Sequence, residues 1–216
     1  MATTISGTAG VTFPAGGVGN PASAVVGTTD SQTLTNKTLT SPTITGAAMS
    51  SMASSVITSG TAQASTSGTS IDFTGIPSWV KRITIMYIGV STSGTSTYLV
   101  QIGDSGGVEI TGYSSNGTTL ATSTIGTANF TTGFAMGDTS SYSAAATHSG
   151  SFVLTLADAS TNTWTGVGTI AAVGQIHNKT GAGSKALSPG PLDRVRITTV
   201  NGTDTFDAGS INILYE

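Results

Sequence analysis

A repeat with a period of five residues constrains this chain most, because that period suits neither regular secondary structure. Between Thr33 and Thr45, one apolar residue flanked by threonines recurs every five positions. Five residues turn an α-helix through about 500°, and they place a side chain on the opposite face of a flat strand. The pattern therefore predicts three extended residues followed by a two-residue corner.

The apolar residues of the repeat are Leu34, Leu39 and Ile44. Burying each of them is worth roughly 1.5–3 kcal/mol, yet one copy of so thin a segment cannot enclose them. Several copies wrapped around a common axis can do so, with these side chains meeting near the axis. We therefore interpret the repeat as a self-associating, fibrous stalk.

The composition favours β-structure with little surface charge. Charged residues make up 8% of the 216 residues and hydrophobic residues 37%, and there are 29 glycines. Disorder normally combines low hydrophobicity with high charge, and this chain lacks the charge. Threonine suits strands, and glycine suits turns and bulges. The sequence thus predicts an all-β protein. A surface with so few charges usually lowers solubility, and this cost is smaller if much of each subunit faces another subunit.

The charge balance and the lack of cysteine argue against several functions. The net charge is −3 and no cluster of Lys or Arg occurs, so we expect no binding of nucleic acid. No apolar run approaches about 18 residues, so we expect no membrane insertion. The first residues lack the basic and apolar regions of a secretory signal. Without cysteine there are no disulfides or thiolate metal sites, and we expect no cofactor.

Shifts in composition divide the chain into three parts. Residues 1–29 are rich in small residues, with one strong local pattern at Val11, Phe13 and Pro14. We interpret them as an extended arm that docks onto another protein, with an unstructured tail as the alternative. Residues 30–68 form the stalk and a linker. Residues 69–216 form the globular part.

Alternating apolar residues and glycine-rich turns in residues 69–216 predict an antiparallel β-sandwich of the jelly-roll kind. In one strand Ile83, Ile85 and Tyr87 alternate, while Met86 and Ile88 lie on its other face, so we expect both sides to be covered. Before this region, a helical spacing of apolar residues predicts one short helix. Its residues are Met49, Met52 and Val56.

Several segments resemble bacteriophage tail-fibre and other virion appendage proteins. Residues 32–46, which hold the repeat, resemble the linker of such proteins, and residues 10–15 are similar to a short N-terminal element of theirs. Residues 70–77, 101–107 and 203–215 resemble their distal globular domain. The matches are scattered over most of the chain, and the threonine-flanked repeat is the most specific of them.

The resemblance implies a homotrimeric protein of the virion. Residues 1–29 would attach it to other virion proteins through Val11, Phe13 and Pro14, and residues 30–68 would form the trimeric stalk. Residues 69–216 would form the tip. Two functions stay open: a tail fibre whose tip binds a host-cell receptor such as a glycan, and a head fibre or capsid decoration protein that stabilises the shell.

One motif suggests catalysis. Residues 103–107, Gly-Asp-Ser-Gly-Gly, match the nucleophile loop of chymotrypsin-like serine proteases, in which glycines let backbone N–H groups form an oxyanion hole. The histidines, His148 and His177, follow Ser105, whereas in that family the histidine comes first. We therefore interpret the motif as a tight hairpin turn between the strands Tyr98–Ile102 and Val108–Ile110, with glycines adopting positive φ.

Other candidate sites are incomplete. Gly181–Lys185 contains half of a phosphate-binding loop without its full spacing, so we expect a flexible loop there. The acidic pairs Asp104 with Glu109 and Asp204 with Asp207 supply too few oxygen ligands for calcium. No obvious carboxylate pair suits glycoside hydrolysis. We expect no enzymatic activity and no metal site.

The candidates for receptor binding are Tyr142, His148 and Trp164. Aromatic rings beside hydroxyl groups suit the flat faces of sugars, and both Tyr142 and Trp164 have Ser or Thr neighbours. Of these two aromatic residues, Tyr142 is the better candidate for an exposed position. The alternatives are a core or subunit-interface position for Trp164 and an ordinary loop position for His148.

Overall fold

The computed structural model describes residues 57–139 and 142–216, and within them the chain is all β, without a helix. The strands are β1 (Thr58–Ser59), β2 (Gln63–Ala64), β3 (Ile71–Thr74), β4 (Arg82–Thr92), β5 (Tyr98–Asp104), β6 (Gly107–Val108), β7 (Ser114–Ala121), β8 (Ile125–Phe130), β9 (Phe134–Met136), β10 (Thr147–Asp158), β11 (Thr163–Val173), β12 (His177–Ala186), β13 (Arg194–Thr199) and β14 (Phe206–Tyr215).

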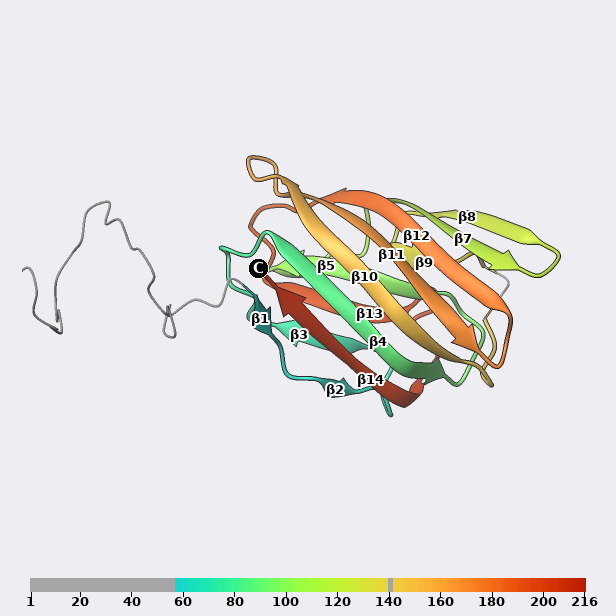
Figure 1. Cartoon of the computed structure of the whole chain (residues 1–216). Helices are drawn as coiled ribbons and strands as arrows, with labels where there is room; N and C mark the ends of the chain where they lie inside the picture. The colour runs from blue at the N-terminus through green and yellow to red at the C-terminus, as the bar shows by residue number, and fades with distance from the viewer. Residues whose placement is uncertain (1–56, 140–141) are drawn as a thin grey trace, which may run out of the picture. The chain divides into compact units, whose positions relative to one another are not determined.

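The strands form two antiparallel sheets, one behind the other (Figure 1). The larger, sheet A, has the order β1-β14-β4-β10-β11-β12-β7-β8, and β2 also pairs with β14. The smaller, sheet B, has the order β3-β13-β5-β6, and β9 also pairs with β5. The expectation of an all-β fold with antiparallel sheets is therefore confirmed.

The core lies between the inner faces of the two sheets, where strand alternation gathers apolar side chains. Phe152 and Leu154 of β10 pair in register with Ile85 and Ile83 of β4, and all four are fully buried. Val195 of β13 enters the same core from sheet B. Because each such side chain contributes roughly 1.5–3 kcal/mol, these rows hold the two layers together.

Two glycines let neighbouring backbones approach closely. A Cβ on Gly168 of β11 would lie 2.5 Å from the carbonyl oxygen of Ser151 in β10, and one on Gly181 of β12 would lie 1.7 Å from the carbonyl oxygen of Ala135 in β9. Only glycine fits such spaces. The expected flexible loop at Gly181–Lys185 is wrong, because these residues belong to β12, whose glycines allow β9 to cross it.

Two further expectations need correction. Met86 is half-buried and Ile88 is 63% exposed, so β4 is covered on its inner side and not on both sides. The strands β1 and β2, which the sequence placed in the linker, pair with β14. The folded sandwich therefore begins before residue 69.

Several predictions concern residues outside the described ranges. These are the arm with Val11, Phe13 and Pro14, the stalk residues Leu34, Leu39 and Ile44, and the short helix through Met49, Met52 and Val56.

The sandwich has two ends, which the 11-residue strand β4 connects over roughly 35 Å. At the first, which we call the Glu216 end, Nη1 of Arg82 donates to Oε1 of Glu216 at 3.0 Å, close to Ile57. At the other, which we call the Val200 end, the N–H of Val200 donates to the carbonyl of Thr97 at 2.9 Å. Residues 57 and 200 thus mark opposite ends.

Candidate functional site

The three residues predicted to contact a receptor lie inside the sandwich. Tyr142 is only 6% exposed, His148 is fully buried within β10, and Trp164 is buried within β11. The expected exposure of Tyr142 and the loop position of His148 are therefore wrong, whereas Trp164 takes its alternative position in the core. Tyr142 turns inward because its hydroxyl donates to the carbonyl of Met136 and its ring lies 4.7 Å from that of Tyr98.

These side chains belong to a polar cluster between the sheets. Oη of Tyr98 lies 3.3 Å from Nδ1 of His148, and Nζ of Lys179 lies 4.1 Å from the centre of the Tyr142 ring. Burial, and secondarily the charge of Lys179, lowers the pKa of His148 to about 4. Burial lowers the pKa of Lys179 to about 8, against the opposing effect of Asp138. Because the cluster is buried, it supports the fold and does not face a ligand.

Ser105 lies in the tight turn between β5 and β6, which confirms the predicted hairpin. The N–H of Gly106 donates to Oδ1 of Asp104 at 2.8 Å, and Gly107 has a φ of +132°. Ser105 is exposed at this turn, whereas His148 is buried against Tyr98. Ser105 and His148 therefore lie in different surroundings, one in an exposed turn and the other between the sheets.

A groove on the outer face of sheet B is the best candidate for a binding site. Its volume is about 330 Å³, and it runs over β5 and β13 toward the loop that follows β13. We call it the sheet B groove. Its lining includes Gln101, Ile110, Arg196, Thr198, Val200 and Asn201.

The floor of the sheet B groove is held by planar polar side chains. Arg196 donates two parallel hydrogen bonds to Asp72, at 2.7 and 2.8 Å, and this carboxylate raises the pKa of the guanidinium. Nε2 of Gln101 donates to the carbonyl of Thr132 at 2.8 Å. These bonds fix the orientation of both side chains before any ligand arrives, which lowers the entropic cost of binding.

The rim of the sheet B groove combines apolar side chains with a braced loop. Ile110 and Val200 are exposed at its edge. Nδ2 of Asn201 donates to Oδ1 of Asp204 at 2.6 Å, and the backbone N–H of Asn201 donates to Oγ of Ser96 at 3.0 Å. The bond to Ser96 ties the loop after β13 to the loop after β4, so the rim is built on the Val200 end of the sandwich.

The groove's chemistry suits a small, uncharged ligand rich in hydroxyl groups. Amide, guanidinium and hydroxyl groups can donate and accept hydrogen bonds at fixed positions, and the apolar rim can pack against C–H groups. The charge of Arg196 is already balanced by Asp72, so an anionic ligand would have to compete with that carboxylate.

Only a weak signal for this groove is present in the amino-acid sequence. The alternation of residues in β13 is visible in the sequence, and it places Arg194 and Arg196 on the face of the strand that points away from the core. The partner of Arg196 is Asp72, 124 residues earlier in the chain, and Ile110 and Val200 come from separate loops. Only the pairing of β3, β13 and β5 brings them together.

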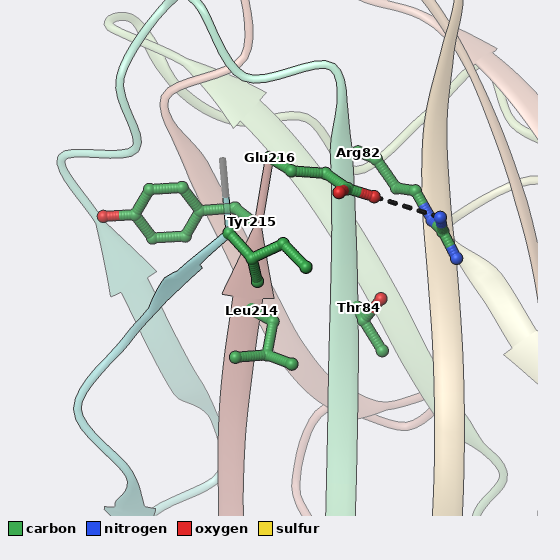
Figure 2. Close-up of a pocket in the computed structure, with 6 residues that line it drawn as sticks. Arg82, Thr84, Leu214, Tyr215 and Glu216 are labelled. Atoms are coloured by element: carbon green, nitrogen blue, oxygen red, sulfur yellow. Dashed lines mark hydrogen bonds and ion pairs between the residues drawn. The ribbon is translucent and has the colours of Figure 1, made fainter. Parts of the chain in front are cut away.

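A second hollow, of about 270 Å³, lies at the Glu216 end. Figure 2 shows Arg82 joined to Glu216, with the ring of Tyr215 directed away from this pair. That ring lies 5.9 Å from the exposed ring of Trp79. Ile57, the first of the described residues, is among those that line this hollow.

Comparison with protein families, curated proteins and solved structures finds no match for this chain. Among residues 57–139 and 142–216, no group of three or more acidic, histidine or cysteine side chains is placed to hold a metal ion. The same residues contain no helix that is long and apolar enough to span a membrane.

Proposed function

We propose that this chain is a structural fibre protein of a bacteriophage virion, a homotrimeric tail fibre whose sandwich binds a host-cell receptor through the sheet B groove. The five-residue repeat and its resemblance to fibre linkers support the fibre. The observation that carries the binding role is the groove itself, with Arg196 and Gln101 held in place beside an exposed apolar rim.

The position of the groove suits a receptor-binding tip. Ile57 lies at the Glu216 end, and the rim residues Val200 and Asn201 lie at the opposite end, across the length of β4. A sandwich attached through residues before Ile57 would therefore carry the groove's rim at its far end. Loops braced on a rigid scaffold are common places for recognition.

The receptor chemistry that fits best is a neutral carbohydrate. A groove of about 330 Å³ is near the lower end of ligand-pocket sizes and suits one or two sugar residues. Each contact would be weak, and several copies of the tip on one fibre would raise the overall affinity through avidity. Because the groove carries no net charge, binding should change little with moderate salt.

The test uses an array of immobilised neutral and acidic oligosaccharides, probed with the full-length protein. Ile110→Arg and Val200→Arg place a long charged side chain at the rim and should abolish binding to the neutral sugars. Ser105→Arg places the same side chain in an exposed turn outside the groove and should bind normally. Retained binding by both rim variants would reject the groove as the site.

The alternative is a head fibre or capsid decoration protein that stabilises the shell. One observation favours it: the broad outer face of sheet A is nearly free of charge and bears exposed apolar side chains, as protein-contacting surfaces often do. Electron microscopy of virions labelled at Glu216 separates the two functions, because label on the head supports decoration and label on the tail supports the fibre.

A further inference from the structure

The outer side of sheet A forms one continuous surface, which we call the sheet A face. It consists of the outward side chains of β14, β4, β10, β11, β12, β7 and β8. Figure 1 shows these strands side by side. Register aligns these side chains in rows across the strands. In one row Thr84, Val153, Val167 and Ala182 are successive neighbours.

Charged side chains avoid this face. Within the described residues it carries charge only at its margins: the Arg82–Glu216 ion pair at one end, and Asp158 and Asp207 near strand ends. The lysines of β12 are buried on its inner side. About a quarter of the residues of an ordinary protein are charged, so a surface of this breadth without central charge is unusual.

Large apolar side chains are exposed on the same face. Ile125 is 71% exposed and Val167 57% exposed, and Ile88, Leu120 and Val173 are exposed as well. Leu120 and Ile125 lie directly opposite each other in the β7–β8 hairpin. Several such side chains on one surface indicate a contact with another protein, whereas single exposed residues do not.

The face is also hollowed near the turn between β11 and β12. The hollow measures about 320 Å³, and its lining includes Leu120, Ala171 and Ile176. It can receive an apolar side chain from an opposing surface, which would give packing beyond simple contact of two flat sheets.

Some polar side chains of the face already form hydrogen bonds within the chain. Oγ1 of Thr180 donates to the carbonyl of Gly168 at 2.8 Å, and Nδ2 of Asn116 donates to Oδ1 of Asn129 at 3.0 Å. Polar groups that keep their hydrogen bonds cost little to remove from water. These side chains can therefore be covered without a partner that supplies matching donors and acceptors.

We propose that the sheet A face binds a second copy of this chain, so that subunits pack through the outer sides of their larger sheets. A second copy offers the same uncharged surface, so contact between two sheet A faces buries no charged side chain without a partner of opposite charge. A partner with an ordinary charged surface would lose the hydration of those charges against a face that cannot pair them. The inference rests on the proposed self-association but does not depend on any receptor.

The test exploits the lack of cysteine in the chain, since an introduced thiol then reports on its own surroundings. Val167→Cys and Ile125→Cys are made in the full-length protein, and their reaction with a maleimide is timed. Thr74→Cys, at an exposed position on β3 of sheet B, is the matched control. We expect both face variants to react on the order of tenfold more slowly than the control, and to react fast after unfolding.

Light scattering on the same samples separates the possible failures. A monomeric protein would overturn both the self-association and the role of the face. An oligomer in which Val167→Cys and Ile125→Cys react as fast as Thr74→Cys would overturn this inference alone, because the copies would then meet elsewhere. Slow reaction of the face variants in a confirmed oligomer supports the proposal.

Discussion

The two outer faces of the sandwich arise from the same strand alternation but present different chemistry. Sheet B presents Arg196 bonded to Asp72, with Gln101 beside them, around a groove. Sheet A presents threonine, valine and isoleucine, with charge only at its margins. Alternation decides which side chains point outward, and their identity decides the surface: an ordered polar groove suits a small ligand, whereas a broad uncharged face suits another protein.

The largest expected effect comes from disturbing the close packing that lies behind both faces. Gly181→Ala should lower the free energy of unfolding by about 3 kcal/mol or more, because the new Cβ would lie 1.7 Å from the carbonyl oxygen of Ala135. Gly190→Ala is the matched control, because its new Cβ would meet no atom nearer than 3.5 Å, and it should melt like the wild type. Thermal unfolding measures both, and an unchanged melting temperature for Gly181→Ala would contradict the packing of β9 on β12.

The interior between the faces should make the fold sensitive to acid. The pKa of His148 is lowered to about 4, whereas an unfolded chain takes up that proton near pH 6.5. The stabilisation is therefore complete above about pH 6.5 and is lost as the pH falls toward 4, by up to about 3 kcal/mol. Urea unfolding at several pH values measures it.

His148→Phe should remove much of this pH dependence, because the buried ring no longer competes for a proton. His177→Gln removes the other histidine of the chain and serves as the control. An equally steep loss of stability with acid in His148→Phe would show that His148 is not the responsible group.

The core and the turns were largely predictable from sequence, because they depend on local pattern. The alternation of Ile83, Ile85 and Tyr87 correctly predicted a strand with this face inward, and residues 103–107 correctly predicted a hairpin. The prediction that the outer side of β4 is covered was wrong. Apolar residues on both faces of a strand do not reveal whether a second layer of structure covers the outer one. Ile88 is exposed instead.

The candidate site was less predictable, because it depends on contacts between distant segments. Glycine-rich β12 has no apolar alternation, and its strand conformation follows from pairing with β11 and β7. The inward turn of Tyr142 depends on the carbonyl of Met136. The aromatic ring and its serine neighbours suggested that Tyr142 is exposed. These features of the sequence do not show that a carbonyl group inside the fold will accept a hydrogen bond from its hydroxyl.

A smaller effect on stability should come from a substitution on the outer face of sheet B. Asp72→Asn removes the charge that Arg196 pairs with, yet both side chains are about one-third exposed. Partly exposed ion pairs contribute little, so the unfolding free energy should change by less than about 1 kcal/mol. The freed guanidinium should, however, increase binding of acidic oligosaccharides on the array. A variant with unchanged ligand preference would argue against a role for this pair in the groove.

The central claim, that the two faces have separate roles, is tested most directly by placing the same charge on each. Val167→Lys and Ile110→Lys are made in the full-length protein, and each is examined by sedimentation velocity and by binding of a soluble oligosaccharide selected on the array. We predict that Val167→Lys disturbs subunit association and leaves oligosaccharide binding intact, while Ile110→Lys does the reverse. Loss of oligosaccharide binding in Val167→Lys, or loss of association in Ile110→Lys, would contradict the account.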